Sequence, residues 1–280
     1  SNIAVVTGAT SGIGRVIAQR LLDEQYTVLA CGRNVFRLQH LVDTNVIDQV
    51  YPLAFDVGST VAWDTQVGLA LSEAPSPPTL LVCAHGAAPC VKPTLELDPA
   101  KVQAIWRTDV LGTLLACQTV GRAMVAQRRG AIVIVSSVHS HVTYPQRTAY
   151  SMAKSALSGL VRSLALEWGP SGVRTNAILP WQCTGPRTEN FIARHLAETG
   201  EDLAELYLQR SPMRRLVTPA DVADAVLFCA RNPLRNKIAR IFAVKPVMAV
   251  FSTISGIYPL EPINHILGSI VINPSSAPLN

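Results

Sequence analysis

Short apolar runs alternate with longer segments of helical periodicity along most of the chain. The runs are rich in β-branched residues and predict six strands, at residues 3–7, 27–31, 50–55, 79–83, 131–135 and 174–179. Helical stretches separate the strands, most clearly at residues 99–128 and 146–168. This alternation predicts a Rossmann-like doubly wound α/β fold, with a parallel sheet covered by helices on both faces.

The pattern changes near the C-terminus. The alternation predicts one catalytic domain over residues 1–234, with a substrate lid at about 182–217, and leaves residues 235–280 as an atypical extension or insertion. Residues 241–260 are apolar, but a lysine and two prolines interrupt them, so a packed insertion or an oligomer contact is favoured over a membrane helix. An aberrant tail from a frame change is a further alternative. Residues 265–273 are a candidate for the last strand of the sheet.

Composition limits the classes of function. Of 280 residues, 49% are hydrophobic and 15% charged, which indicates a large core. The net charge of +5 is small and dispersed, so no nucleic-acid partner is expected. The six cysteines form no Cys-x-x-Cys pair, His139 and His141 lack further metal ligands nearby, and the first strand starts at once. These features predict a cytoplasmic protein with no structural disulfide, no metal and no signal peptide.

A glycine-rich turn follows the first strand. Residues 7–14 read Thr-Gly-Ala-Thr-Ser-Gly-Ile-Gly and lead into a helical stretch. Backbone N–H groups and the positive end of a helix meet at such a turn, which suits a pyrophosphate. The alternative is a glycine-rich turn that binds nothing, and the second predicted strand argues against it.

The residues after the second strand bear on the choice of cofactor. NAD-binding chains tend to carry an acid there, whereas an arginine accommodates a 2′-phosphate. This chain has Gly32-Arg33-Asn34, so NADP(H) is favoured and NAD(H) is the alternative. Arg33 as a solvated loop cation is the competing interpretation, and the nearby Ser11 and Arg15 do not decide between the two.

Tyr150 and Lys154 are four residues apart in a predicted helix, which places both side chains on one face. An ammonium beside a phenol favours release of the phenolic proton. Such a tyrosine can exchange a proton with an alcohol or a ketone. The alternative is an ordinary helix face.

Taken together, these motifs resemble the short-chain dehydrogenase/reductase family over roughly residues 3–230. The resemblance rests on the cofactor motif at residues 7–14, on Asp56-Val57, on Ser137, Tyr150 and Lys154, and on residues 164–178, which resemble the family's long helix and sixth strand. It implies that Tyr150 is the general acid/base, that Lys154 holds the nicotinamide ribose, and that Ser137 orients the substrate oxygen. It also implies a homo-oligomer, either a tetramer or a dimer.

The resemblance implies a set of cofactor contacts. They are Gly8, Thr10, Ser11, Gly12, Ile13, Gly14, Arg33, Asp56, Val57, Gly86, Tyr150, Lys154, Pro180 and Thr184.

Several signature positions depart from the family. Asn-Asn-Ala-Gly after the fourth strand is replaced by Cys83-Ala84-His85-Gly86, where the cysteine is expected to pack in place of an amide that braces the sheet. Asp109 replaces a catalytic asparagine, which implies an altered proton relay and a negative charge near Lys154. Trp181 replaces a glycine, so it is expected near the nicotinamide, where it either stacks or blocks. Thr184 stands one place earlier than the family's threonine.

Two functions follow from the sequence. The first is an NAD(P)-dependent oxidoreductase that interconverts a secondary alcohol and a ketone, on a sugar, polyol, hydroxy acid or acyl-thioester substrate. The second, motivated by the departures, is a cofactor-binding scaffold or sensor with little or no turnover.

Overall fold

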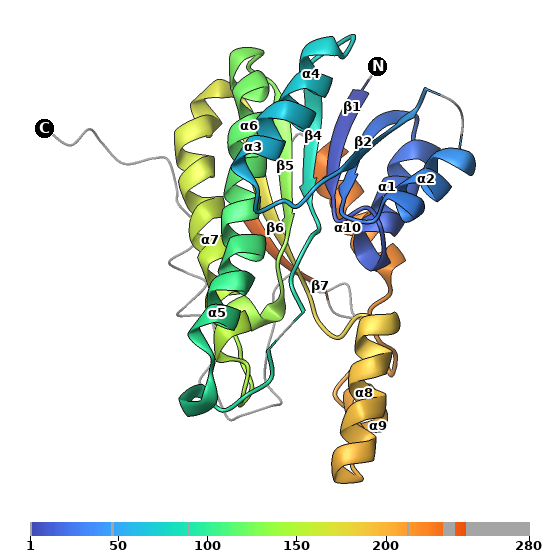
Figure 1. Ribbon diagram of the computed structural model, residues 1–280, viewed down its shortest axis with the longest axis vertical. Coiled ribbons are helices and arrows are strands. Elements are labelled where there is room, and N and C mark those ends of the chain that lie inside the picture. The colour runs from blue at the N-terminus through green and yellow to red at the C-terminus, as the bar shows by residue number, and fades with distance from the viewer. Residues whose placement is uncertain (1, 46–47, 89, 212, 232–238, 245–280) are drawn as a thin grey trace, which may run out of the picture.

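Seven parallel strands form a single sheet in the order β3-β2-β1-β4-β5-β6-β7 (Figure 1). The computed structural model describes residues 2–45, 48–88, 90–211, 213–231 and 239–244. The strands are β1 Asn2–Thr7, β2 Tyr26–Gly32, β3 Val50–Ala54, β4 Pro78–Cys83, β5 Gly130–Val135, β6 Val173–Pro180 and β7 Ala239–Val244. All six strands predicted from the sequence are confirmed to within one residue at each end.

Helices cover both faces of the sheet (Figure 1). They are α1 Gly12–Asp23, α2 Val35–Asp43, α3 Thr60–Ala62, α4 Leu69–Glu73, α5 Pro99–Trp106, α6 Gly112–Ala126, α7 Thr148–Trp168, α8 Pro186–Thr199, α9 Leu203–Gln209 and α10 Pro219–Arg231. Helices α1, α2 and α10 lie on one face, and α5, α6 and α7 on the other. The central strands are therefore buried on both sides, which explains their continuous apolar runs: every residue of β5 is buried.

The strand order reverses beside β1, whose neighbours are β2 and β4. In sheets of this kind, ligands bind outside the carboxyl ends of the strands at the reversal. The glycine turn after β1 and the loops after β4, β5 and β6 all emerge at this end. The topology therefore predicts where a cofactor and a substrate would meet.

The helical stretch predicted at residues 99–128 is not one continuous helix. A π-helical segment, η3 Arg107–Leu111, separates α5 from α6. Such segments often occur at functional sites because the extra residue re-aims a side chain. Here the segment carries Asp109.

The predicted lid projects beyond the sheet as α8 and α9 (Figure 1). Gly200, with a φ of +75°, ends α8 and separates it from α9. A parallel β-bridge between Cys183 and Val217 joins the two ends of the lid.

Strand β7 was not indicated by the sequence. It pairs with β6 and starts after residue 234, so the sheet extends into the segment expected to be an extension. The place beside β6 belongs to Ala239–Val244, and residues 265–273, the candidate for this strand, lie outside the described residues. Within the described part, no helix is both long and apolar enough to cross a membrane.

Candidate active site

The glycine turn joins β1 to α1 in a conformation that its glycines make possible. Gly8 and Gly12 have φ values of +73° and +53°, a region that favours glycine. A Cβ on Gly14 would lie 2.3 Å from the Gly8 carbonyl oxygen, so α1 could not pack this closely with any larger residue. The space beside the Cβ position of Gly12 is open, and Ser11 does not cap the helix with its side chain. This arrangement fits a pyrophosphate at the start of α1.

The residues expected at the adenosine end of the cofactor lie beside this turn. Gly32, at the end of β2, packs against Thr10 so closely that a Cβ would meet its methyl group at 2.4 Å. Arg33 follows directly and is exposed. Asp56, after β3, is also exposed, and its Oδ1 accepts a hydrogen bond from Gly58 N at 2.9 Å. The loops after β1 and β2 therefore meet, and Arg33 is exposed beside them.

The three residues expected to carry catalysis come from the loop after β5, which holds Ser137, and from α7, which holds Tyr150 and Lys154. Lys154 Nζ lies 5.5 Å from the centroid of the Tyr150 ring, as their spacing predicts. Ser136 Oγ donates to the Lys154 carbonyl at 3.2 Å and ties the end of β5 to α7. Ser137 Oγ accepts from His139 N at 3.2 Å, and the His139 and Tyr150 ring centroids are 5.5 Å apart.

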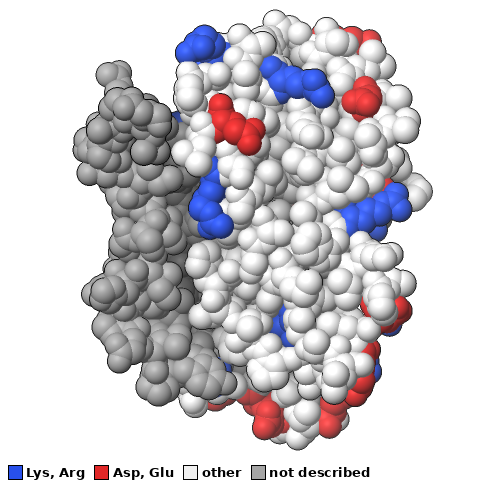
Figure 2. Space-filling view, turned by 90° about the vertical axis from the view of Figure 1, so that its left-hand side faces the viewer, with Lys and Arg blue, Asp and Glu red and all other residues white. Residues whose placement is uncertain are grey.

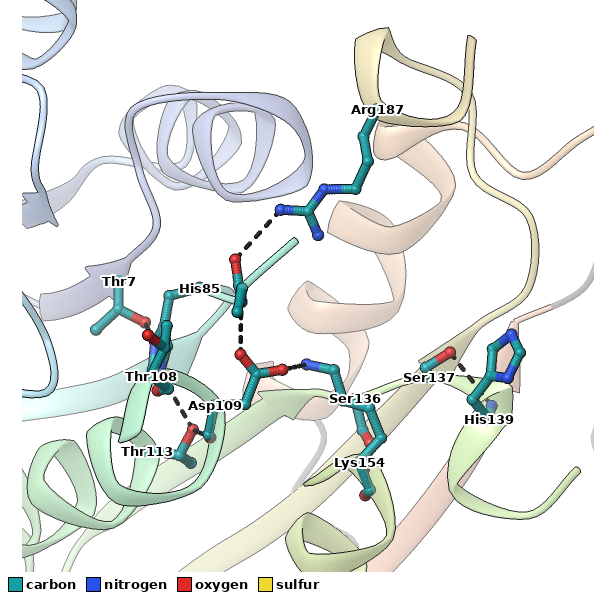
Figure 3. Close-up of polar contacts among 12 residues, drawn as sticks. Thr7, His85, Thr108, Asp109, Thr113, Ser136, Ser137, His139, Lys154 and Arg187 are labelled. Atoms are coloured by element: carbon teal, nitrogen blue, oxygen red, sulfur yellow. Dashed lines mark hydrogen bonds and ion pairs between the residues drawn. The ribbon is translucent and has the colours of Figure 1, made fainter. Parts of the chain in front are cut away.

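Asp109 forms a buried ion pair with Lys154 (Figure 3). The two groups are 3.0 Å apart, and each side chain is at most 4% exposed. The second oxygen of Asp109 accepts from Ala87 N at 2.6 Å. Burial alone would lower the pKa of Lys154, but the charges of Asp109 and Tyr150 outweigh that effect and raise it. Lys154 is therefore an ammonium, and the carboxyl group of Asp109 lies beside it.

His85 braces the site in the place where the family carries an alanine. Its Nε2 lies 3.1 Å from the Thr108 carbonyl oxygen. Because a carbonyl oxygen can only accept, Nε2 is the donor and carries the proton of the ring. Nδ1 then accepts from Thr7 Oγ1 at 2.6 Å. The ring thus links the end of β1 to η3 (Figure 3). Cys83 is buried in β4 and packs in the core, as expected, while His85 supplies the polar contacts between β1 and η3.

The ring of His85 is held neutral. Burial lowers its pKa from 6.5 to about 4, and the charge of Asp109 opposes this only in part. The unfolded chain therefore binds a proton at higher pH than the folded chain, and stability is lost as pH falls from 6.5 towards 4. We expect the free energy of unfolding to fall by up to about 1.4 kcal/mol per pH unit for each such histidine.

His139 has a similarly lowered pKa of about 4, and burial also lowers the pKa of His141, so three histidines contribute to the slope in the wild type. His85→Asn should remove one of them. Urea unfolding at several pH values measures the slope, and an unchanged slope in His85→Asn would rule out this role for His85.

The loop after β6 leads into the lid. Pro180 ends β6, and Trp181 is buried, with its ring centroid 6.2 Å from that of Tyr207 in α9. Trp181 is thus packed against the lid. Thr184 N donates to the Val217 carbonyl at 2.8 Å, and no hydrogen bond of its side chain occurs among the described residues.

Two residues that the sequence did not indicate also lie at the site. Arg187, at the start of α8, reaches across to donate to the Gly86 carbonyl at 3.2 Å (Figure 3). A Cβ on Gly86 would lie 3.4 Å from Lys154 Nζ, so a glycine lets this loop approach the lysine. Arg147 lies beside Tyr150 on the chain and against the lid. Neither arginine belongs to a sequence motif. Each is placed at the site by a contact between the lid and another part of the chain, which no local pattern reveals.

The chain is similar to known proteins in both sequence and fold. Residues 2–195 match the protein family described as short chain dehydrogenase. The chain is 30% identical to 2-(R)-hydroxypropyl-CoM dehydrogenase of Xanthobacter autotrophicus, over 82% of this chain and 91% of the relative. It is 32% identical to galactitol 2-dehydrogenase of Rhizobium johnstonii, over 81% and 87%. The fold is similar to that of 3-oxoacyl-[acyl-carrier protein] reductase of Brucella melitensis, with a TM-score of 0.75, 26% identity and coverage of 87% and 90%.

Proposed function

The chain belongs to the short-chain dehydrogenase/reductase family, which acts on CH–OH donors with a nicotinamide dinucleotide, and we propose that it interconverts a secondary alcohol and a ketone. The observation that carries the proposal is that the half-buried Tyr150 lies beside the buried Lys154 on α7, and that Ser136, the neighbour of Ser137, ties the end of β5 to Lys154. The glycine turn after β1 supports cofactor binding at the same end of the sheet.

The residues act in a definite order in the oxidation direction. The Ser137 hydroxyl accepts from a backbone N–H, so its own proton is free for the substrate oxygen. Tyr150 takes the proton of the substrate hydroxyl, and Lys154 stabilises the phenolate needed for this step. A nicotinamide dinucleotide, which the glycine turn after β1 and Lys154 would hold, would supply the hydride acceptor for this oxidation. In reduction, Tyr150 returns the proton to the carbonyl oxygen.

Asp109 favours a second candidate, a cofactor-binding protein with little or no turnover. Its carboxylate is 3.0 Å from the ammonium that would support the phenolate of Tyr150, so the two anions compete for one cation. We expect this competition to slow the proton transfer. The intact Ser137, Tyr150 and Lys154 favour the enzyme.

A panel of sugars, polyols, hydroxy acids and acyl-thioesters tests the proposal. The full chain is incubated with each alcohol and NADP+ or NAD+, and the absorbance of the reduced nicotinamide is followed. Turnover of at least one secondary alcohol supports the enzyme. Cofactor binding without turnover of any alcohol or ketone supports the second candidate.

We further propose a preference for NADP(H), supported by the exposed Arg33 and the absence of an acid after β2. Arg33→Ala should weaken NADPH binding by roughly 10- to 100-fold, as expected for losing a charge-assisted hydrogen bond to the 2′-phosphate. NADH binding should change by less than about threefold, since NADH lacks that phosphate. Fluorescence titration measures both affinities. Arg20→Ala, which removes an exposed arginine paired with Asp224, is the control. Equal losses for the two cofactors would contradict the preference.

A cytoplasmic homo-oligomer, either a tetramer or a dimer, completes the proposal. The face formed by α5, α6 and α7 carries few charges (Figure 2). Its exposed apolar side chains include Trp106, Met152 and Leu166, which suit contact with a second copy. Light scattering of the full chain tests this, and a monomer would contradict it.

A further inference from the structure

Arg147 lies at the entrance to the proposed substrate site. It is the residue that precedes α7, one helical turn before Tyr150. Its guanidinium carbon is 4.5 Å from the centroid of the Phe191 ring, on the lid helix α8. The residue is half-buried, so the charge is held between the start of α7 and the lid.

The charge of Arg147 has no protein partner in the part of the chain that the structure describes. No carboxylate there lies within ion-pair distance, and its side chain donates no hydrogen bond. Arg194 provides a contrast, because it lies 5.9 Å from the same ring but pairs with Glu198 at 3.8 Å. A guanidinium carries five N–H donors, and leaving them unpaired and partly desolvated is costly. Stacking on Phe191 uses the face of the group and leaves the donors along its edge available.

Within the described ranges, the side chains that interact electrostatically with Arg147 are two tyrosines, Tyr207 and Tyr150, and Arg194, so none of them is a carboxylate. Burial, and then the charge of Arg147, lower the pKa of His139 to about 4, so this ring is neutral near pH 7. Burial raises the pKa of Tyr207, although the charge of Arg147 opposes this. The neighbouring side chains therefore leave the guanidinium uncompensated.

His139 adds an unpaired polar atom to the same place. Its Nδ1 is buried and has no hydrogen-bond partner among the described residues. The ring lies between two tyrosines, with centroid distances of 5.3 Å to Tyr144 and 5.5 Å to Tyr150. A buried polar nitrogen without a partner points to a ligand group that is absent from the protein itself.

We propose that Arg147, assisted by His139, binds an acidic oxyanion of the substrate: a carboxylate, phosphate or sulfonate. This inference rests on the proposed function and narrows its substrates to acidic alcohols and ketones. Because Arg147 and Tyr150 are neighbours on one side of the helix start, the acidic group lies a few bonds from the carbinol carbon. A neutral polyol would leave the guanidinium unpaired.

Matched pairs of substrates test the inference. The probes are β-hydroxybutyrate with its methyl ester, lactate with methyl lactate, and glycerol phosphate with glycerol. In Arg147→Met, KM for the acidic member should rise by roughly 10- to 100-fold, as expected for one lost charge-assisted contact. The kcat value, and KM for the neutral member, should change by less than about threefold. Arg147→Lys should recover part of the loss because it keeps the charge.

Arg194→Met is the control for the lid, because it removes the other arginine that contacts Phe191. If Arg147 only holds the lid, Arg147→Met should impair acidic and neutral members equally, which would overturn the inference. A second outcome would overturn the inference and leave the proposed function intact. In it, both members are turned over at rates that Arg147→Met does not change, and Tyr150→Phe abolishes the turnover.

If no probe is turned over, the proposed function loses support, and binding then decides the inference separately. Calorimetry measures the binding of the same acids to the cofactor complex. Binding that is at least about 10-fold weaker in Arg147→Met than in the wild type supports the acidic subsite. Equal binding, or no binding to the wild type, overturns it.

Discussion

Replacing Tyr150 with phenylalanine is expected to lower kcat/KM for alcohol oxidation by about 10²- to 10⁴-fold, the usual contribution of general acid/base catalysis. Only the phenolic hydroxyl is removed, so the ring keeps its edge contact with His139 and its place beside Lys154. Cofactor affinity should change by less than about threefold. Steady-state kinetics and cofactor titration on the same preparation measure both quantities.

Tyr144→Phe is a matched control for this variant. Tyr144 also contacts the His139 ring, with centroids 5.3 Å apart, but it lies in the loop before α7 and not one turn from Lys154. Its loss of a hydroxyl should change kcat by less than about threefold. If the two variants lose activity equally, the hydroxyl of Tyr150 has no special role.

Replacing Asp109 with alanine is expected to lower the free energy of unfolding by about 3–5 kcal/mol, the range for removing one partner of a buried ion pair. The ammonium of Lys154 would then be buried without its partner, and Ala87 N–H would lose its acceptor. Chemical unfolding measures the loss. The control is Asp224→Ala, which breaks the exposed pair with Arg20 and should cost no more than about 1 kcal/mol. Equal losses would show that the buried pair is not special.

Asp109→Asn separates the structural role of this residue from its effect on Tyr150. The amide oxygen can still accept from Ala87 N, while the negative charge beside Lys154 is removed. Asp109 acts through Lys154, so it is a positioning residue. If the carboxylate competes with the phenolate, Asp109→Asn should raise kcat and move the alkaline limb of the pH–rate profile. An unchanged profile would contradict the competition.

The sequence predicted most of the sheet because its central strands are buried on both faces. Such strands require continuous apolar runs, which are visible without any tertiary information. The cofactor turn and the Tyr150–Lys154 pair could also be predicted from the sequence, since each depends on residue spacing within one local element. The residues of these motifs are brought to one end of the sheet by its topology.

The remaining features depend on contacts between distant segments. His85 follows β4 and contacts Thr7 in β1 and Thr108 in η3, so its partners are distant in the sequence. No local pattern distinguishes it from an ordinary buried residue. The π-helical turn at η3 has no sequence signature that separates it from a regular helix. The importance of Arg147 comes from the lid residue Phe191, which is more than 40 residues away along the chain.

Strand β7 illustrates a different difficulty. Its residues, Ala239–Val244, overlap the start of the apolar stretch at residues 241–260, and such a run does not reveal by itself which part of it forms a strand. Pairing with β6 selects these six residues.

The most direct test of the proposed chemistry is transfer of a label. A ketone from the substrate panel is reduced with a cofactor carrying deuterium at the transferable position of the nicotinamide, and the product is examined by mass spectrometry. The account predicts one deuterium on the carbinol carbon with the wild type, formed about 10²- to 10⁴-fold more slowly with Tyr150→Phe. Cofactor binding with no deuterated product from any ketone, or equal rates for the two proteins, would contradict it.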